Sequence, residues 1–255
     1  MTEVQNIREV MLRERICVLV PTYNNAGTIA DVLRRVGKYT DSIIVVNDGC
    51  TDDTVKQVEK SGVKLCTVVS YTPNRGKGYA LMAGFRAALR EGYSYAITID
   101  SDAQHFPEDL PRFIDTFLQH RGALIVGARN LNEDNMPRKN TFANKFSNFW
   151  FYLQTGIHLE DTQTGYRLYP LSQISNKWVV TYRYESELEL LVYIAWKGVE
   201  VVSVPVRVYY PPAGERVTHF RPFWDFMRIT LLNTWLTTAA FCYYIPVRWL
   251  RRIFH

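Results

Sequence analysis

The chain is poor in cysteine and has no closely spaced cysteine pair. Its 255 residues include four cysteines, none within a C-x-x-C pair: Cys17, Cys50, Cys66 and Cys242. This spacing fits neither a zinc site nor a disulfide framework, so we expect reduced thiols and a cytoplasmic compartment. Residues 1–15 lack the apolar core of a signal peptide, and we expect none.

The chain also lacks a charge excess over most of its length. Hydrophobic residues make up 47% of it and charged residues 22%, which excludes a disordered polyelectrolyte and allows one large α/β domain with an appendage. The net charge is +5, but residues 207–255 alone hold seven Arg against two acidic residues. The first 206 residues are therefore neutral in sum. A neutral body with a cationic end excludes a basic groove for nucleic acid and suits an anionic membrane surface.

Five short β-rich runs alternate with stretches of helical spacing. The runs are 16–21, 42–47, 63–70, 95–100 and 123–128, and the helical stretches between them are 27–38, 52–60, 79–91 and 107–120. This alternation predicts right-handed βαβ units, and therefore an α/β fold with a mostly parallel sheet flanked by helices. Later in the chain we expect helices at 142–155 and 185–196 and a strand at 199–209.

Three of the predicted strands end in polar residues, at the edge where parallel sheets bind their ligands. These ends are Thr22-Tyr23-Asn24-Asn25, Asn47-Asp48-Gly49 and Asp100-Ser101-Asp102. Asp100 and Asp102 would repel each other unless a cation lay beside them, and hard oxygen ligands suit Mg²⁺ or Mn²⁺. The alternative for this pair is a solvated turn that caps the next helix.

A basic loop, 74–78, precedes the third helical stretch with the sequence Asn-Arg-Gly-Lys-Gly. It is not a Walker A loop, because Tyr71 and Gly78 stand where that motif needs Gly and Ser or Thr. Leu81 likewise breaks the dinucleotide-binding pattern. We expect this cationic loop to contact an anion.

Together these motifs resemble those of the family 2 glycosyltransferases, which have a GT-A fold. The similarity is greatest to the branch that contains dolichyl-phosphate mannose synthase and the bacterial polyprenyl-phosphate glycosyltransferases. It rests on the series 20–24, 45–52, 74–78 and 99–105, and continues through 127–129 and 161–167. The combination, over roughly residues 14–170, is far more specific than any single motif.

The resemblance implies a nucleotide-sugar site with a divalent metal ion. The nucleotide sugar would contact strand-end and loop residues, namely Pro21, Thr22, Tyr23, Asn25, Asp48, Lys77, Asp100, Ser101 and Asp102. Asp102 and Gln104 would hold the ion, Mg²⁺ or Mn²⁺.

On the acceptor side, the resemblance implies that Arg129 binds a phosphate. This chain has Asn140 and Asn144 where the family has a second phosphate-binding arginine and a serine. Arg138 or Lys139, together with Asn144, would then complete the acceptor site.

The chemistry of the two sides differs. The charge of a leaving diphosphate must be stabilised, which a metal ion does. A lipid phosphate attacks as an anion, whereas a hydroxyl acceptor also needs a general base. Asp161, Glu185 and Glu187 are candidates for that base, although both glutamates also fit a charged helix start. Arg167 would close on the diphosphate or pair with Asp161, and the expected catalytic residues are Asp102, Asp161 and Arg167.

Residues 229–247 carry no charge over a length that approaches a membrane span. Thr or Asn stands at 230, 233, 234, 237 and 238, a helical series that leaves one apolar face. We therefore expect an amphipathic helix in the membrane interface, with packing on the protein or a true span as alternatives. The expected division is an N-terminal extension (1–14), a GT-A catalytic domain (15–210) and a basic membrane-associating segment (211–255).

The expected function is transfer of a mannose- or glucose-type sugar from a nucleotide diphosphate to a polyprenyl or dolichyl phosphate. It would take place at the cytoplasmic face of a membrane, on a peripheral or monotopic protein. The alternatives are a lipid or glycan hydroxyl as acceptor, and a non-catalytic scaffold that binds nucleotide sugars at the membrane. The resemblance also implies inversion at the sugar carbon, and the sequence does not indicate an oligomeric state.

Overall fold

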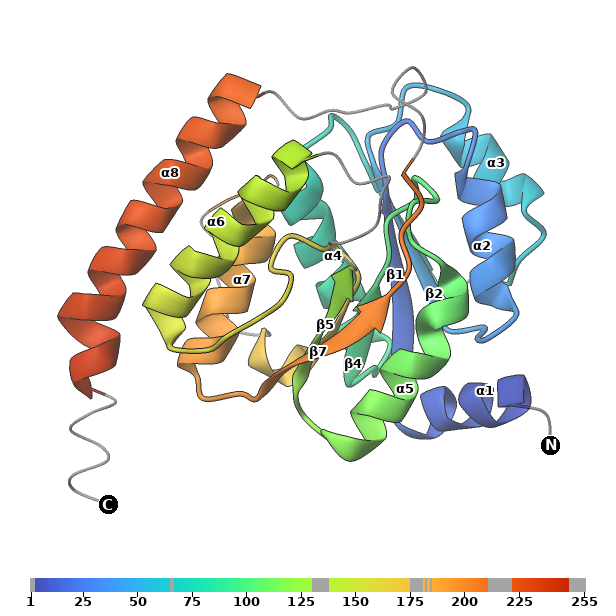
Figure 1. Cartoon of the computed structure of the whole chain (residues 1–255). Coiled ribbons are helices and arrows are strands. Elements are labelled where there is room, and N and C mark those ends of the chain that lie inside the picture. The colour runs from blue at the N-terminus through green and yellow to red at the C-terminus, as the bar shows by residue number, and fades with distance from the viewer. Residues whose placement is uncertain are drawn as a thin grey trace.

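A seven-stranded sheet forms the centre of the molecule (Figure 1). The structure is a computed structural model that describes residues 3–64, 67–129, 138–174, 181, 183, 185–210 and 222–247. The strands are β1 (Ile16–Thr22), β2 (Ile43–Asp48), β3 (Thr67–Tyr71), β4 (Tyr95–Thr98), β5 (Leu124–Arg129), β6 (Arg167–Pro170) and β7 (Val201–Val206), in the order β3-β2-β1-β4-β6-β5-β7. Pairings between these strands are parallel except that β6 runs antiparallel to β4 and β5. The predicted mostly parallel sheet is confirmed.

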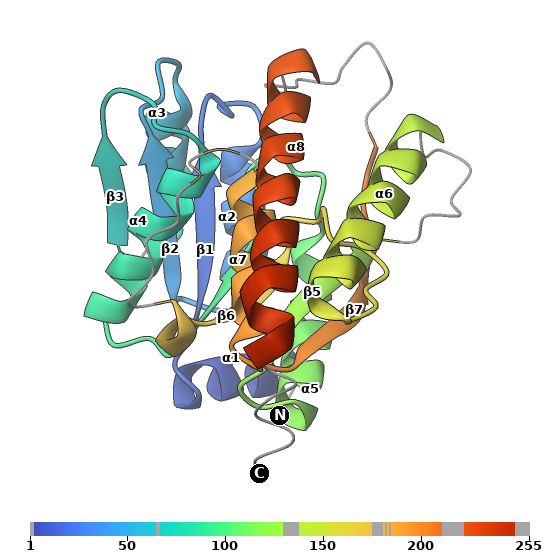
Figure 2. The ribbon, with the colours of Figure 1, turned by 90° about the vertical axis from the view of Figure 1, so that its left-hand side faces the viewer.

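Helices cover both faces of this sheet. They are α1 (Glu3–Arg13), α2 (Ile29–Gly37), α3 (Thr54–Lys60), α4 (Lys77–Arg90), α5 (Leu110–Gln119), α6 (Arg138–Thr155), α7 (Glu185–Trp196) and α8 (Pro222–Ala239). Short 3-10 turns stand at Pro107–Asp109 and Leu171–Gln173, and a π-helical stretch, Ala240–Tyr244, extends α8. Helices α1, α2 and α5 lie on one face, and α4, α6, α7 and α8 lie on the other (Figures 1 and 2).

The alternation of side chains along each strand divides the core in two. In β1, Leu19 packs into the cluster that contains α4, α7 and α8, whereas Val18 and Val20 pack into the cluster that contains α1, α2 and α5. Every residue of β1 is buried, as the apolar sequence of a strand covered on both faces requires.

Strand β6 is an element that the sequence did not predict as a strand. It has only four residues, too few to show alternation, and all four are buried. Its antiparallel direction has a consequence for function, because its first residue lies at the edge where β4 and β5 end. The segment 161–167 is thereby brought to the ligand-binding edge of the sheet.

The C-terminal helix packs on the catalytic body. Leu236 and Ala240 are fully buried, and α8 contacts α6 and α7. Two members of the polar series face the protein, because Gln154 of α6 donates to Asn233 Oδ1 at 3.1 Å and to Thr237 Oγ1 at 3.2 Å. Among the described residues, no helix is both long enough and apolar enough to cross a membrane.

The residues predicted as an N-terminal extension also join the core. Ile7, Val10 and Met11 of α1 are buried in the cluster beneath α5. This helix therefore closes the end of the sheet opposite the ligand-binding edge (Figure 1).

Candidate functional site

The ends of β1, β2 and β4 bring the predicted polar residues to one edge, toward which the β3 arrow points in Figure 2. Asn25, beyond β1, donates from Nδ2 to Oγ of Ser101, beyond β4, over 2.8 Å. Thr28 Oγ1 donates to the Ser101 carbonyl over 2.6 Å. These bonds hold the loops after β1 and β4 together, so the predicted nucleotide-binding residues from both strands share one site.

A lysine and two carboxylates form the charged centre of this edge, which we call the Lys77 cluster (Lys77, Asp100 and Glu187). Lys77 Nζ lies 2.8 Å from Asp100 Oδ1 and 3.0 Å from Glu187 Oε2. Burial lowers the pKa of the Lys77 ammonium, but the two carboxylates outweigh it and the net pKa is raised. Burial would raise the pKa of Asp100, yet the Lys77 charge holds it below its usual value. Lys77 and Asp100 are therefore both charged.

The Lys77 cluster packs against Gly165, just before β6. A Cβ atom at this position would lie 2.7 Å from both Asp100 Oδ2 and Lys77 Nζ, and 3.2 Å from Glu187 Oε1. Thr98 Oγ1 of β4 donates to the Gly165 carbonyl over 2.7 Å and fixes the backbone there. A larger residue at this position would require the ends of the Asp100 and Lys77 side chains to shift.

Asp102 is the second carboxylate beyond β4. Burial and the neighbouring Asp100 charge raise the pKa of Asp102 to about 6. Its Oδ1 accepts the Gln104 N–H at 3.0 Å. In the described part of the chain, no three His, Cys, Asp or Glu side chains gather to hold a metal ion. Mg²⁺ and Mn²⁺ commonly use one or two carboxylates plus substrate phosphates, and a carboxylate such as Asp102, which burial and the Asp100 charge hinder from ionising, fits such an ion.

Asp48, at the end of β2, orders the basic loop. Its Oδ1 accepts the Arg75 N–H at 2.8 Å, and its Oδ2 accepts the Gly76 N–H and an Asn74 Nδ2 hydrogen, both at 2.9 Å. Burial raises the pKa of Asp48, although these hydrogen bonds oppose it. Asp48 thus positions the start of α4, while its contact with a nucleotide stays a prediction.

Arg129 and Asp161 form a buried ion pair. Arg129 Nε lies 2.5 Å from Asp161 Oδ2, and Nη2 lies 3.0 Å from Oδ1. Asn144 Nδ2 and the Gln163 N–H also donate to Oδ1. Although burial would raise the pKa of Asp161, the hydrogen bonds from Arg129 lower it. A general base needs an accessible lone pair and a raised pKa, so this arrangement speaks against the expected role of Asp161 as a base.

Arg167 has a structural task. Its side chain is fully buried, and it donates to the carbonyls of Thr164, Thr162 and Glu187 at 2.7–2.8 Å. These bonds tie the start of β6 to the first turn of α7. They engage all three guanidinium nitrogens, which speaks against direct contact of Arg167 with a substrate, and the Arg167 charge also lowers the pKa of the nearby Asp100.

The remaining predicted acceptor residues stand at the start of α6. Arg138 and Lys139 begin this helix, and their side chains lie outside what the structure describes. Asn144 is buried against Asp161.

Sequence reasoning did not find the position that Glu187 occupies in the Lys77 cluster. A glutamate in the first turn of a helix is common, so the sequence carried no signal for this placement. For Gly165 there was a signal, because it lies within the segment 161–167 that carries the family resemblance.

Comparison with known proteins shows the family of this chain. Residues 17–175 match the family model described as glycosyl transferase family 2. The chain belongs to this family. It is therefore a transferase, not the non-catalytic scaffold considered as an alternative.

This family 2 glycosyltransferase has relatives among archaea and bacteria. It is 29% identical to polyprenol monophosphomannose synthase of Mycolicibacterium smegmatis, over 76% of this chain and 77% of that one. It is 26% identical to UDP-N-acetylglucosamine-dolichyl-phosphate N-acetylglucosaminyltransferase of Methanococcus voltae, over 78% and 88% of the two chains. A crystal structure of glucosyl-3-phosphoglycerate synthase from Mycobacterium tuberculosis shares the fold, with a TM-score of 0.66 at 19% identity over 93% of this chain and 83% of that one.

The Arg129–Asp161 pair yields a stability prediction. Arg129→Gln would leave a buried carboxylate without its cation, which costs about 3 kcal/mol of unfolding free energy. Urea denaturation followed by circular dichroism measures this loss. The matched control is the double variant Arg129→Gln/Asp161→Asn, which removes the orphaned charge and should regain most of the loss. A single variant as stable as the wild type would contradict the structural role of the pair.

Proposed function

We propose that this glycosyltransferase moves a mannose- or glucose-type sugar from a nucleotide diphosphate to a polyprenyl phosphate, at the cytoplasmic face of a membrane. The observation that carries the proposal is the Lys77 cluster beside Asp102, where opposite charges meet at the ligand-binding edge of the sheet. Named relatives support the acceptor, because they include a polyprenol monophosphomannose synthase and an undecaprenyl-phosphate mannosyltransferase. The structural neighbour, solved with UDP-glucose and Mn²⁺, supports the donor class.

On the donor side, the nucleoside would lie against the loop after β1. Pro21, Thr22 and Tyr23 would face it, with Asn25 held in place by Ser101. The diphosphate would then extend toward the Lys77 cluster, where the ammonium supplies a positive charge. Asp48 would act through the loop that positions Lys77.

Asp102 and Gln104 would hold the divalent ion. A bound Mg²⁺ or Mn²⁺ would stabilise the negative charge that develops on the leaving diphosphate. The raised pKa of Asp102 supports this assignment, since a carboxylate that burial and the neighbouring Asp100 charge hinder from ionising gains most from a nearby cation.

The acceptor phosphate needs positive charge but no general base. A phosphomonoester is already an anion at neutral pH, so its oxygen can attack the sugar without losing a proton to the protein. The engagement of both Asp161 oxygens is consistent with such a reaction. The family resemblance assigns Arg129, with Arg138 or Lys139 and Asn144, to this side, but the Arg129 guanidinium is already paired with Asp161.

A hydroxyl acceptor is the second candidate, and one observation favours it. Glu187 Oε1 is buried and has no hydrogen-bond partner within the described residues, while Oε2 pairs with Lys77. A carboxylate oxygen in that position could receive the proton of an attacking hydroxyl.

Exposed apolar side chains support the membrane part of the proposal. Helices α6 and α8 lie side by side in the outer layer (Figures 1 and 2). Large apolar residues on their outer surfaces are 42–65% exposed: Phe146, Phe149 and Tyr152 on α6, and Met227, Leu231, Trp235 and Phe241 on α8 and its extension. Such residues partition into the membrane interface, and the arginines of 207–255 would add attraction to anionic lipids.

The transfer reaction is tested with purified protein, Mn²⁺ and undecaprenyl phosphate, offered GDP-mannose, UDP-glucose and UDP-N-acetylglucosamine separately. Mass spectrometry should detect a lipid phosphate that carries one sugar. Asp102→Asn should lower the rate at least about a hundredfold, because charge stabilisation at the leaving group is lost. The exposed Asp53→Asn is the matched control and should retain the wild-type rate. Product formed only with hydroxyl acceptors, or no product with any of the three donors, would overturn the proposal.

Membrane binding is tested by co-sedimentation with vesicles of phosphatidylcholine and phosphatidylglycerol. Phe149→Ser/Phe241→Ser should weaken binding at least about tenfold, since each buried aromatic ring contributes on the order of 2 kcal/mol. Leu12→Ser/Leu118→Ser removes two exposed apolar residues from α1 and α5, on the other face, and should bind as the wild type does. Equal losses in both double variants would show that the α6 and α8 surface has no special role.

A further inference from the structure

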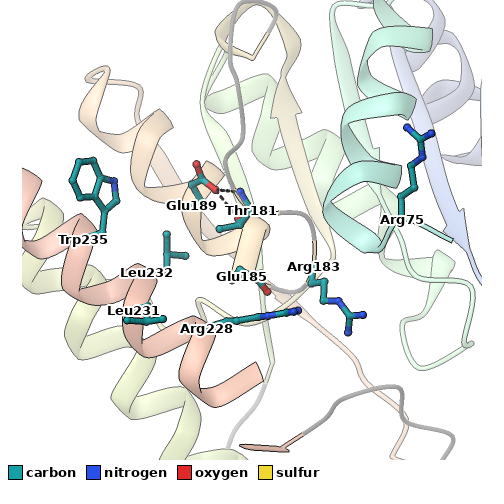
Figure 3. A pocket seen from close by; sticks show the side chains of 9 residues that line it. All are labelled: Arg75, Thr181, Arg183, Glu185, Glu189, Arg228, Leu231, Leu232 and Trp235. Atoms are coloured by element: carbon teal, nitrogen blue, oxygen red, sulfur yellow. Dashed lines mark hydrogen bonds between the residues drawn. The ribbon is translucent and has the colours of Figure 1, made fainter. Parts of the chain in front are cut away.

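A cavity of about 470 Å³ lies between α8 and the chain that leads into α7 (Figure 3). Its α8 wall is apolar and consists of Leu231, Leu232 and Trp235. Leu231 and Trp235 are more than 60% exposed, so this wall continues onto the outer apolar surface of α8. The cavity therefore opens toward the surface that we propose to contact the membrane.

One end of the cavity is cationic. Arg75, Arg183 and Arg228 line it, and Figure 3 shows Arg228 reaching from α8 toward Arg183, with Trp235 at the opposite end. The cavity thus has a charged end and an apolar end, as an amphiphile does.

Two glutamates also line the cavity. Glu189 Oε2 accepts both the N–H and the hydroxyl of Thr181, at 3.0 and 2.6 Å. Glu185 is buried, and its Oε2 has no hydrogen-bond partner in the described part of the chain. Three guanidinium groups against two carboxylates leave one positive charge in excess. A phosphomonoester, which carries between one and two negative charges near pH 7, complements this balance.

The cationic end of the cavity adjoins the donor site. Arg75 lies two residues before Lys77, and its backbone N–H donates a hydrogen bond to Asp48 Oδ1. Glu185 and Glu187 stand in the same first turn of α7, and Glu187 pairs with Lys77. The segment at the start of α4 and the first turn of α7 therefore contribute residues to both the cavity and the Lys77 cluster.

We propose, on the basis of the function proposed above, that this cavity is the subsite for the head of the polyprenyl phosphate. Arg183 and Arg228 bind the phosphate, and the first isoprene units lie against Leu231, Leu232 and Trp235. The volume is within the usual range for small-ligand sites, and holds the phosphate with the start of the chain rather than the whole lipid. The rest of the chain leaves along the exposed side of α8 into the membrane.

This subsite differs from the one at Arg129 that the family resemblance implies. The Arg129 guanidinium is paired with Asp161 through two of its nitrogens, which balances its charge. If the phosphate binds in the cavity, substitution of Arg183 or Arg228 should weaken its binding. If it binds at Arg129, those substitutions should leave binding unchanged.

The test measures binding of farnesyl phosphate, a soluble short-chain probe, to the purified full chain by isothermal titration calorimetry. Arg183→Gln and Arg228→Gln should each weaken binding at least about tenfold, the size expected when a charge-assisted hydrogen bond to phosphate is lost. Trp235→Ala should weaken the binding of farnesyl phosphate but leave the binding of inorganic phosphate unchanged. Arg90→Gln, on the exposed surface of α4, is the matched control and should bind as the wild type does. Thermal denaturation of each variant confirms that it is folded.

If the wild type binds farnesyl phosphate, two outcomes would overturn the subsite. One is wild-type affinity in both arginine variants, with binding lost in Arg129→Gln/Asp161→Asn, which would place the phosphate at Arg129. The other is equal competition by micellar phosphatidic acid, which would make the cavity a site for anionic lipids in general. Absence of binding by the wild type would also reject the subsite, whereas the transfer assay decides the proposed function separately.

Discussion

The site depends on one electrostatic constraint, which is that several carboxylates meet at the carboxyl edge of a parallel sheet. Asp100 and Asp102 both follow β4, whereas Glu187 comes from α7, and these buried negative charges must be offset by positive charge. Lys77 offsets two of them. Asp102 is left with a raised pKa, which suits a site that takes a cation together with its substrate. The other contacts at this edge position the loops that carry these charges.

Sequence reasoning predicted the strands and the strand-end motifs because apolar runs that stop at polar residues are local features. It did not predict β6, whose four residues show no periodicity and which forms only by inserting between β4 and β5. The sequence also could not predict which groups Asp161 and Arg167 contact. Both residues lie in the motif 161–167, but their burial and partners are set by packing against β5 and α7. A motif thus predicted which segment reaches the site, and not which of its side chains face the substrate.

Helix α8 connects the fold to the proposed membrane function. Its polar series predicted a helix with one polar side that faces water. In the structure, Asn233 and Thr237 accept hydrogen bonds from Gln154, and the opposite side of the helix exposes Leu231 and Trp235. A buried polar side chain costs little free energy when it is hydrogen-bonded. Because the polar side of α8 can therefore face the protein, its apolar side chains lie on the outer surface. One helix therefore closes the core beside α7 and also supplies one wall of the cavity next to the donor site.

The most direct test of the account is the binding of a nucleoside diphosphate to the Lys77 cluster. Isothermal titration of UDP and GDP with Mn²⁺ would compare the wild type with Gly165→Ala, whose added methyl group intrudes on Asp100 and Lys77. Gly27→Ala is the control, because its added Cβ meets open space. The account predicts at least about tenfold weaker binding for Gly165→Ala, equivalent to about 1.4 kcal/mol, and wild-type affinity for Gly27→Ala. A folded Gly165→Ala protein that binds the nucleotide as tightly as the wild type would contradict it.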